Sequence, residues 1–517
     1  MDLAIKIVLL AVFFGVMTGI GLYCRRHATD VSGFVLGGRS VGPWLTAFAY
    51  GTSYFSAVVF VGYAGQFGWK YGVAATWAGL GNAFLGSLLA WAVLGRRTRV
   101  MTQHLDSATM PEFFGRRFDS RALKLCASVI IFIFLIPYTA SLYNGLSRLF
   151  GMAFAIDYSV CVVVMAILTG VYVIAGGYMA TAINDFIQGI IMLAGIAAVI
   201  GAVLHTQGGF LAALEKLARV QGDSGVPGVY ASFFGPDPVN LLGVVLLTSL
   251  GTWGLPQMVQ KFYAIKSEAA ISKGTVISTV FALVVAGGCY FLGGFGRLYA
   301  DRIDIQANGY DSIIPVMLSG LPAILIAVVV ILVLSASMST LSSLVLASSS
   351  TLTLDFIKGN IIKDMDEKRQ VRWMRGLVVV FIAISVVLAL IQYKSSVTFI
   401  AQLMGVSWGA LAGAFLAPFL YGLYWKRTTK AACWVSFVFS AVFMLAVISP
   451  LKTALPPLLQ SPINAGAFCM IAGLVIVPAV SLFTRAPGEK RLEEIFSCYE
   501  RRVTVTVKDS IGEQNSH

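Results

Sequence analysis

The sequence has few charged residues for its length. Only 12% of its 517 residues are Asp, Glu, Lys or Arg, whereas 58% are hydrophobic. In a typical soluble domain about a quarter of the residues are charged, because they cover its surface. The composition therefore excludes an ordinary soluble protein and predicts an integral membrane protein.

Residues that carry metal and enzyme chemistry are also scarce. The chain has four histidines and seven scattered cysteines, without a CxxC pair or a Cys/His cluster, so we do not expect a zinc or haem site. No Walker A motif is present, and no GxGxxG occurs in a strand–helix setting. The apolar segments hold neither a His/Asp constellation nor paired carboxylates. We therefore do not expect an enzyme.

What the sequence does contain is a series of long apolar segments. A helix needs about 20 apolar residues to cross a bilayer, and about thirteen segments meet that requirement. They are 3–24, 43–68, 72–95, 122–147, 157–177, 181–205, 239–262, 274–298, 320–350, 373–393, 396–424, 431–450 and 463–484. The predicted fold class is an all-α integral membrane protein.

Basic residues occur mainly in alternate connections between these spans. They follow the first span (Arg25, Arg26), the third (Arg96, Arg97, Arg99), the seventh (Lys261, Lys266, Lys273) and the eleventh (Lys426, Arg427, Lys430), and they fill the connection between the ninth and tenth. The positive-inside rule makes this side cytoplasmic. We expect a plasma-membrane protein with its N-terminus outside. The net charge of +13 is then explained mostly by these cytoplasmic basic residues. We therefore expect no nucleic-acid partner.

Two similar stretches occur five spans apart. "YGTS" at 50–53 and "LGTWG" at 250–254 place Gly-Thr inside the second and seventh spans. Because five is odd, the two blocks of helices that begin there would have opposite orientations, which is the pattern of an inverted-repeat transporter with its binding site at broken helices. A break at 51–53 would free carbonyls for Na⁺. Alternatively, Gly51 only permits close helix packing.

A strip of hydroxyl groups runs along the ninth span. It consists of Ala336, Ser339, Thr340 and Ser343, with Ser342 at its edge. Residues three and four apart share a helix face, so these side chains would point the same way. They would either complete a cation shell begun by the second span or bond to nearby carbonyls and helices.

Asp185 lies near the cytoplasmic entry of the sixth span. A carboxylate at membrane depth is costly, and it therefore suggests a function such as Na⁺ binding or proton transfer. At the boundary of the span it could instead be solvated.

Six segments resemble the sodium:solute symporter family, which includes sodium/proline, sodium/pantothenate, sodium/sialic acid and sodium/glucose transporters. They are "FVLGGRSVGPWLTA" 34–47, "MPEFFGRRF" 110–118, "YVIAGGYMA" 172–180, "NDFIQG" 184–189, "QKFYAIKS" 260–267 and "MSTLSS" 338–343. The segments occur in the family's order and extend over most of the chain.

The resemblance implies a leucine-transporter-like core. Five helices and five inverted helices form it, with one extra helix before and two after. The divisions would be 1–42 (N-terminal helix and loop), 43–205 (first repeat), 206–238 (external loop), 239–424 (second repeat), 425–484 (two C-terminal helices) and 485–517 (cytoplasmic tail).

The resemblance also implies cation sites. One Na⁺ would be bound by the backbone carbonyls of Thr52, Phe55 and Ala336 and the hydroxyls of Ser339 and Thr340. A second Na⁺, bound in only some members, would use Asp185, Ser339, Ser342 and Ser343. All of these residues are present, which allows two Na⁺ per cycle without fixing that number.

The solute pocket is expected between the breaks of the two interrupted helices, at 51–56 and 251–257. Candidate residues are Tyr54, Ser56, Thr252, Trp253 and Gln257, followed by Gln66, Asn82 and Asn144. Trp253 would either stack on the solute or pack with its indole N–H satisfied. Pro256 would keep the seventh span broken or kinked.

The predicted function is Na⁺-coupled import of a small organic solute by alternating access. The candidate residues are uncharged, which favours a zwitterion or a carboxylate held by helix N-termini and hydroxyls, such as an amino acid, pantothenate or a monocarboxylate. Two other functions stay open. A transporter-fold sensor would need a signalling domain that the tail lacks, and a sodium-permeable channel would conduct without solute.

Overall fold

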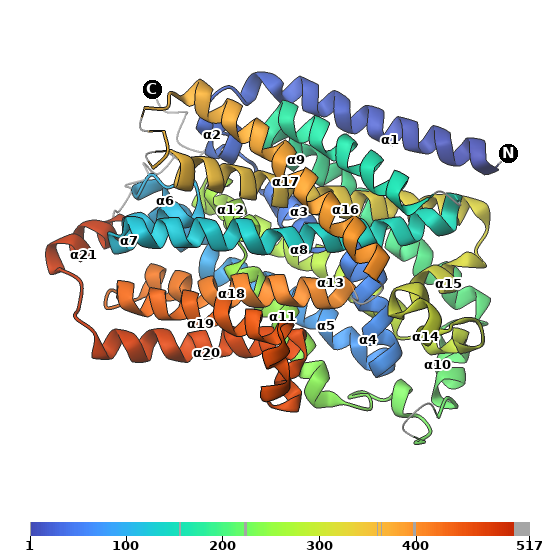
Figure 1. Ribbon diagram of the computed structural model, residues 1–517. Coiled ribbons are helices and arrows are strands. Elements are labelled where there is room, and N and C mark those ends of the chain that lie inside the picture. The colour runs from blue at the N-terminus through green and yellow to red at the C-terminus, as the bar shows by residue number, and fades with distance from the viewer. Residues whose placement is uncertain are drawn as a thin grey trace, which may run out of the picture.

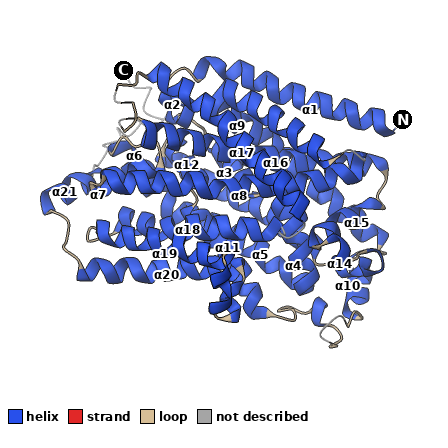
Figure 2. Cartoon of the chain, in the orientation of Figure 1, coloured by secondary structure: helices blue, strands red, loops and turns tan. Residues whose placement is uncertain are grey.

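A computed structural model describes residues 2–154, 157–221, 225–358, 360–362, 364–395 and 400–500. Within them the chain is helical and has no β-strand (Figure 2). Some predicted features lie outside the described residues, namely 222–224 of the external loop, 396–399 at the start of the eleventh span, and 501–517 of the tail.

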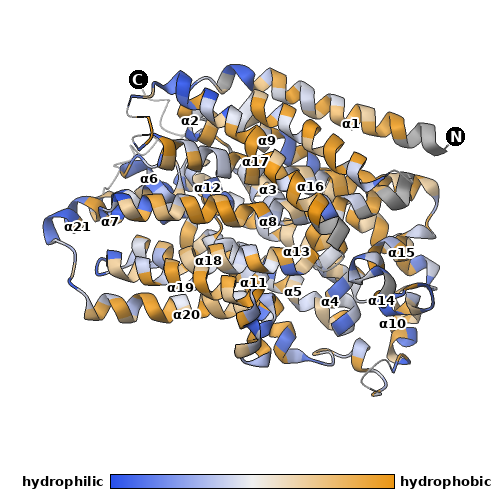
Figure 3. Ribbon diagram, in the orientation of Figure 1, coloured by the Kyte–Doolittle hydropathy of each residue, from blue (hydrophilic) through white to orange (hydrophobic). Residues whose placement is uncertain are grey.

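Long helices lie side by side and form one bundle (Figure 1). They are α1 (Asp2–Cys24), α8 (Arg121–Phe154), α9 (Tyr158–Thr206), α13 (Glu268–Gly293), α16 (Ala323–Thr351), α17 (Glu367–Ser395), α18 (Ile400–Tyr424), α19 (Lys430–Ile448) and α20 (Pro462–Phe483). Hydrophobic residues dominate these helices in Figure 3. Aliphatic side chains such as Val12, Val280 and Ile391 are more than half exposed on the bundle surface, as expected of helices that face lipid.

Short helices gather at the two ends of the bundle. At the left of Figure 1 lie α2 (Val31–Leu36), α6 (Arg96–His104), α7 (Met110–Phe118) and α21 (Glu489–Phe496). At the right lie α10 (Phe210–Ala218), α14 (Ile305–Asn308) and α15 (Ile313–Ser319), on the same side of the bundle as the start of α1. The first helix therefore starts at the end of the bundle opposite to α21.

Ten helices of the described chain are long and apolar enough to cross a membrane, or eleven if the bent pair α11 (Pro238–Gly254) and α12 (Pro256–Ala264) is one span. Thirteen were predicted. The difference arises because the helical stretches 58–104 and 158–206 are 47 and 49 residues long, more than twice the length of one crossing. Each covers two predicted spans.

A glycine with positive φ interrupts both long stretches where the predicted spans meet. Gly177 has φ +56° and ψ −147°, and Gly72 has φ +63°. This backbone region is open to glycine and strained for other residues. A Cβ at Gly72 would also lie 2.0 Å from the carbonyl oxygen of Tyr230. The two glycines therefore allow the chain to change direction between spans.

The interrupted helices lie at the centre of the bundle. The first is α3 (Pro43–Tyr54) with its continuation α4 (Ala64–Tyr71), and the second is the α11–α12 pair. Helix α16 packs against α3, α8, α9 and α12, while α11 packs against α18 and α20. This arrangement brings the hydroxyl strip of α16 to the break in the first interrupted helix.

Candidate functional site

The first break follows α3. Phe55 has an extended backbone (φ −88°, ψ 118°), and the helix resumes as a π-helical segment, Val58–Tyr63. Ser56 caps the new start, since its Oγ accepts a hydrogen bond from the Val58 amide at 3.2 Å. The break thus frees the carbonyls at the end of α3.

The break lies at Phe55, within the predicted range 51–56, whereas Gly51–Ser53, where the helix was expected to loosen, stay helical. Gly51 has a different role. A Cβ at this position would lie 2.4 Å from a ring carbon of Phe281. The alternative interpretation, in which Gly51 permits close helix packing, agrees with this contact.

The second interrupted helix has the same design. Leu255 is extended (φ −78°, ψ 125°) between α11 and α12, which are bent by 46°, and Pro256 begins α12 as predicted. A Cβ at Gly251 would lie 2.4 Å from the Trp408 ring. In each half, a glycine packs against an aromatic ring and the extended residue follows four positions later.

Five oxygen atoms meet where α3 ends beside α16. The Thr340 hydroxyl lies 3.0 Å from the Thr52 carbonyl oxygen, 3.2 Å from that of Phe55 and 3.1 Å from that of Ala336. The Ser339 hydroxyl lies 3.1 Å from the Thr52 oxygen and 3.0 Å from that of Ala336. All five residues are at most 1% exposed. We call these five residues the first cation group, after the Na⁺ site that the resemblance implies for them; the structure brings them together through hydrogen bonds.

The hydroxyls of this group bond both within α16 and across to α3. The bonds to Ala336 are the local kind that membrane helices often contain, whereas the bonds to Thr52 join two elements. The Thr52 side chain is not part of the group, because its own hydroxyl donates to the Phe48 carbonyl. In transporters with discontinuous helices, backbone carbonyls at the unwound segment coordinate Na⁺. This group offers such carbonyls beside two hydroxyl oxygens.

Two of the four residues predicted for a second Na⁺, Asp185 and Ser343, contact a lysine. Asp185 is fully buried, which removes the alternative that it is solvated at a span boundary. Its Oδ2 lies 3.8 Å from Nζ of Lys261, which donates to Ser343 Oγ at 3.0 Å. Ser342 instead donates to the Ser339 carbonyl. The prediction that Lys261 belongs to a cytoplasmic loop is wrong, since it lies within α12 and is 2% exposed.

Four predicted solute residues already have hydrogen-bond partners. They are Asn82, Asn144, Thr252 and Trp253. The Trp253 indole N–H donates to the Leu85 carbonyl at 2.9 Å, and the side chain is 6% exposed. This geometry favours the packing interpretation of Trp253 over stacking on a solute. Ser56 is similarly engaged as a helix cap.

Three other predicted solute residues keep polar atoms without a partner among the described residues. They are Tyr54 (hydroxyl), Gln66 (Oε1) and Gln257 (both amide atoms). Each is at most 4% exposed. Since buried polar groups are usually hydrogen-bonded, such atoms are candidates for contact with a ligand.

Further buried aromatic residues share this feature, and sequence reasoning did not single them out. Tyr138, Tyr290 and Trp408 are examples, because within the described chain their hydroxyl or indole groups have no partner. The Trp408 and Tyr138 rings pack edge to face, 5.9 Å apart. An aromatic residue with one polar atom inside an apolar span was the available signal, but many such residues only pack.

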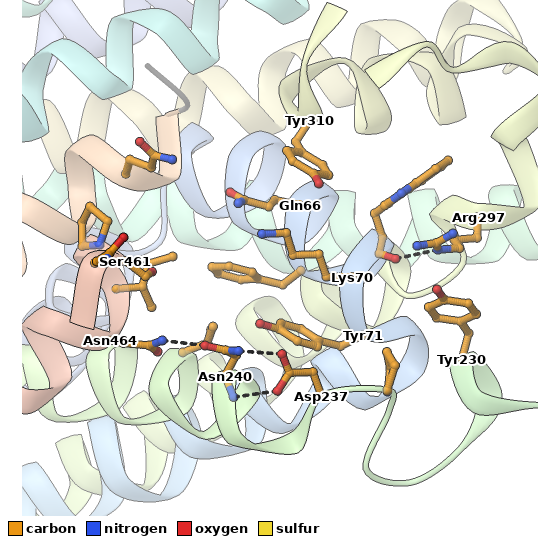
Figure 4. A pocket seen from close by; sticks show the side chains of 18 of the residues that line it. Gln66, Lys70, Tyr71, Tyr230, Asp237, Asn240, Arg297, Tyr310, Ser461 and Asn464 are labelled. Atoms are coloured by element: carbon orange, nitrogen blue, oxygen red, sulfur yellow. Dashed lines mark hydrogen bonds between the residues drawn. The ribbon is translucent and has the colours of Figure 1, made fainter. Parts of the chain in front are cut away.

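A cavity of about 720 Å³ opens at the end of the bundle where α4 ends and α11 begins. Gln66 and Lys70 project into it (Figure 4). Arg297 also lines it, held between the rings of Trp69 and Tyr230. Asp237 on the same wall is hydrogen-bonded to Asn240. The cavity thus combines aromatic walls with cationic groups.

A second cavity of about 540 Å³ is lined by residues of α2, α7 and the segments beside them. Beside it, the buried carboxylate of Asp355 accepts a hydrogen bond from Thr109 at 2.5 Å and pairs with Lys124 at 3.2 Å. These contacts connect the helical segment that follows α16, Leu352–Ile357, to the start of α7 and to α8. The bundle therefore has a polar cavity at each end.

Comparison with known proteins gives a consistent result. The family model described as "Sodium:solute symporter family" matches residues 34–438. A sodium/proline symporter of Staphylococcus aureus is 30% identical over 496 residues, which are 93% of each chain.

Two solved structures have similar folds. The structure of a Na⁺-coupled sialic acid symporter, in a substrate-bound outward-open state, has a TM-score of 0.74 at 16% identity and covers 94% of this chain and 99% of its own. A nucleobase-cation-symport-1 family transporter has a TM-score of 0.50 at 14% identity, covering 89% and 97%. At these identities the likeness concerns the fold alone. The family model and the sequence relative, which span most of the chain, show that this protein belongs to the sodium:solute symporter family and couples solute transport to Na⁺.

Proposed function

We propose that this symporter imports a small solute carrying a carboxylate, with Na⁺ bound at the first cation group. The observation that carries the proposal is the meeting of three carbonyl and two hydroxyl oxygens from α3 and α16. No side-chain charge belongs to this group, so a bound Na⁺ keeps its full charge. Its removal would leave α3 and α16 connected only by hydroxyl hydrogen bonds.

Na⁺ would act by stabilising one arrangement of the bundle. While it is bound, the broken α3 is tied to α16, and the solute binds to the outward-facing form. Each positive charge that moves inward gains about 2.3 kcal/mol per 100 mV of inside-negative potential. Release of Na⁺ on the inner side would loosen α3 from α16 and allow the solute to leave.

The outer cavity supports an acidic or zwitterionic solute. Lys70 contributes an ammonium group that has no ion pair of 4 Å or less among the described residues, beside the Tyr310 ring at 5.2 Å. Gln66 at the cavity wall and Gln257 at the second break offer amide groups that bind a carboxylate or an amine. Aromatic walls provide apolar contact for a small carbon skeleton.

The proposal also covers the orientation of the chain in the membrane and its division into two repeats. We infer that the N-terminus and the cavity at Lys70 face outward, and that the cavity at α7 faces the cytoplasm. The first repeat would be 43–205 and the second 239–424, related by the two similarly placed breaks at Phe55 and Leu255.

The test is a thermal-shift screen of the purified protein, followed by uptake into proteoliposomes. Proline, pantothenate, lactate and glucose are compared in Na⁺ and in K⁺. We expect a carboxylate-bearing compound to raise the melting temperature only in Na⁺, and an imposed inward Na⁺ gradient to drive its accumulation. Stabilisation by glucose alone, or stabilisation that is equal in K⁺, would contradict the proposal.

A further inference from the structure

The buried lysine of α12 lies where a second cation would bind. Nζ of Lys261 is 3.0 Å from Ser343 Oγ and 3.8 Å from Asp185 Oδ2. The ring of Tyr178 covers it at 5.1 Å. Ser343 Oγ also lies 2.9 Å from Ser53 Oγ of α3. One ammonium group is therefore enclosed by side chains from α9 and α16, and linked through Ser343 to α3.

We propose that the Lys261 ammonium is the resident cation of this second group, so that the chain binds a single Na⁺, at the first cation group. The inference rests on the proposed Na⁺ site and determines how many Na⁺ ions that mechanism uses. The Lys261 ammonium, which is covalently attached to α12, takes the place of the second Na⁺.

Electrostatics supports this assignment. Lys261 and Asp185 are 2% and 0% exposed, and in such an environment charges interact strongly because water screens them little. The carboxylate has no hydrogen-bond donor among the described residues, so the ammonium is its counter-charge. A Na⁺ bound between Asp185 and Ser343 would meet this ammonium at close range. The two positive charges would repel one another, and only one carboxylate would offset both.

The position of the lysine on α12 gives it a mechanical role as well. At the first break, Na⁺ would connect the broken α3 to α16. In the second interrupted helix, Lys261 lies in α12 six residues after Leu255 and connects this helix to Ser343 of α16 and Asp185 of α9. The two broken helices are thus held by cations in comparable ways. The Na⁺ leaves in every cycle, whereas the lysine stays.

Counting bound Na⁺ tests the inference without knowledge of the solute. Radioactive Na⁺ is titrated by equilibrium dialysis against the purified full-length protein. We expect the wild type to bind one Na⁺ per chain. The K261Q variant removes the ammonium and leaves Asp185 free for a second ion, so we expect two. The control K266Q changes an exposed lysine just after α12, and we expect one.

Two further variants separate this inference from the proposed function. D185N should leave the count at one, because Asp185 would not be a Na⁺ ligand in the wild type. If the wild type binds two ions and D185N binds one, Asp185 holds Na⁺ and the inference is overturned. An unchanged count of one in folded K261Q would also overturn it. By contrast, unchanged Na⁺ affinity in both S339A and T340A would refute the first cation group, whatever Lys261 does.

Discussion

The T340A substitution gives the sharpest test of the first cation group. The Thr340 hydroxyl is the oxygen with the most contacts there, because it lies within 3.2 Å of three carbonyl oxygens. With Na⁺ bound, that hydroxyl would turn its proton away and offer a lone pair to the ion. An interaction of this kind with a charged group contributes about 1.5–3 kcal/mol. At 1.4 kcal/mol per tenfold change, Na⁺ affinity should fall about 10- to 150-fold.

Folding should suffer less than ion binding. In the absence of Na⁺ the same hydroxyl makes neutral hydrogen bonds, whose net contribution is about 1 kcal/mol. The assay is a Na⁺ titration of the melting temperature, which gives affinity and basal stability together. The T340S variant keeps the oxygen and should behave almost as the wild type.

The matched control is S350A. Ser350 is also buried in α16, and its hydroxyl bonds only to the carbonyls of Leu346 and Ala347 within that helix. Its loss should leave Na⁺ affinity unchanged. If T340A and S339A both keep wild-type Na⁺ affinity, the hydroxyls do not bind the ion and the site lies elsewhere.

Three further outcomes are expected. G51A should lower stability by about 1–3 kcal/mol by overpacking against Phe281, measured as a lower melting temperature. G15A should not, because among the described residues its new Cβ would meet nothing within 4 Å apart from its chain neighbours and the backbone of its own helix. Equal melting temperatures of the two variants would contradict the close packing. K70M should raise the KM for carboxylate uptake about tenfold, equivalent to about 1.4 kcal/mol, and an unchanged KM would remove Lys70 from the solute path. Q257L should weaken solute binding, measured by isothermal calorimetry, while Na⁺ affinity stays within a factor of about two, because this amide has no partner among the described residues. A loss of Na⁺ binding would instead assign Gln257 to the ion site.

Some errors of the sequence prediction have a common cause. The break was predicted within 51–56 and centred on Gly51–Ser53, because glycine and small polar residues loosen a helix. The structure keeps 51–53 helical, where Gly51 makes room for the Phe281 ring, and places the break at Phe55. Lys261 was assigned to a cytoplasmic loop because it follows an apolar run. Its position inside the bundle depends on Asp185, which lies on another helix.

The sequence by itself determined the features that depend on local periodicity and length. The apolar runs specify the helices, since each run is long enough to cross a bilayer. The spacing of Ala336, Ser339 and Thr340 puts three oxygens of the first cation group on one side of α16. Pro256, which cannot continue a helix, sets the start of α12.

Tertiary structure decided which of these local features meet. The carbonyls of Thr52 and Phe55 face hydroxyls that are 285 to 288 residues away in the chain, and no local pattern specifies such a pairing. The same holds for Trp253, whose indole is satisfied by Leu85, and for Lys261 beside Asp185. Whether a buried polar group binds an ion, a solute or a neighbouring carbonyl depends on which atoms surround it, and packing of distant helices supplies those atoms.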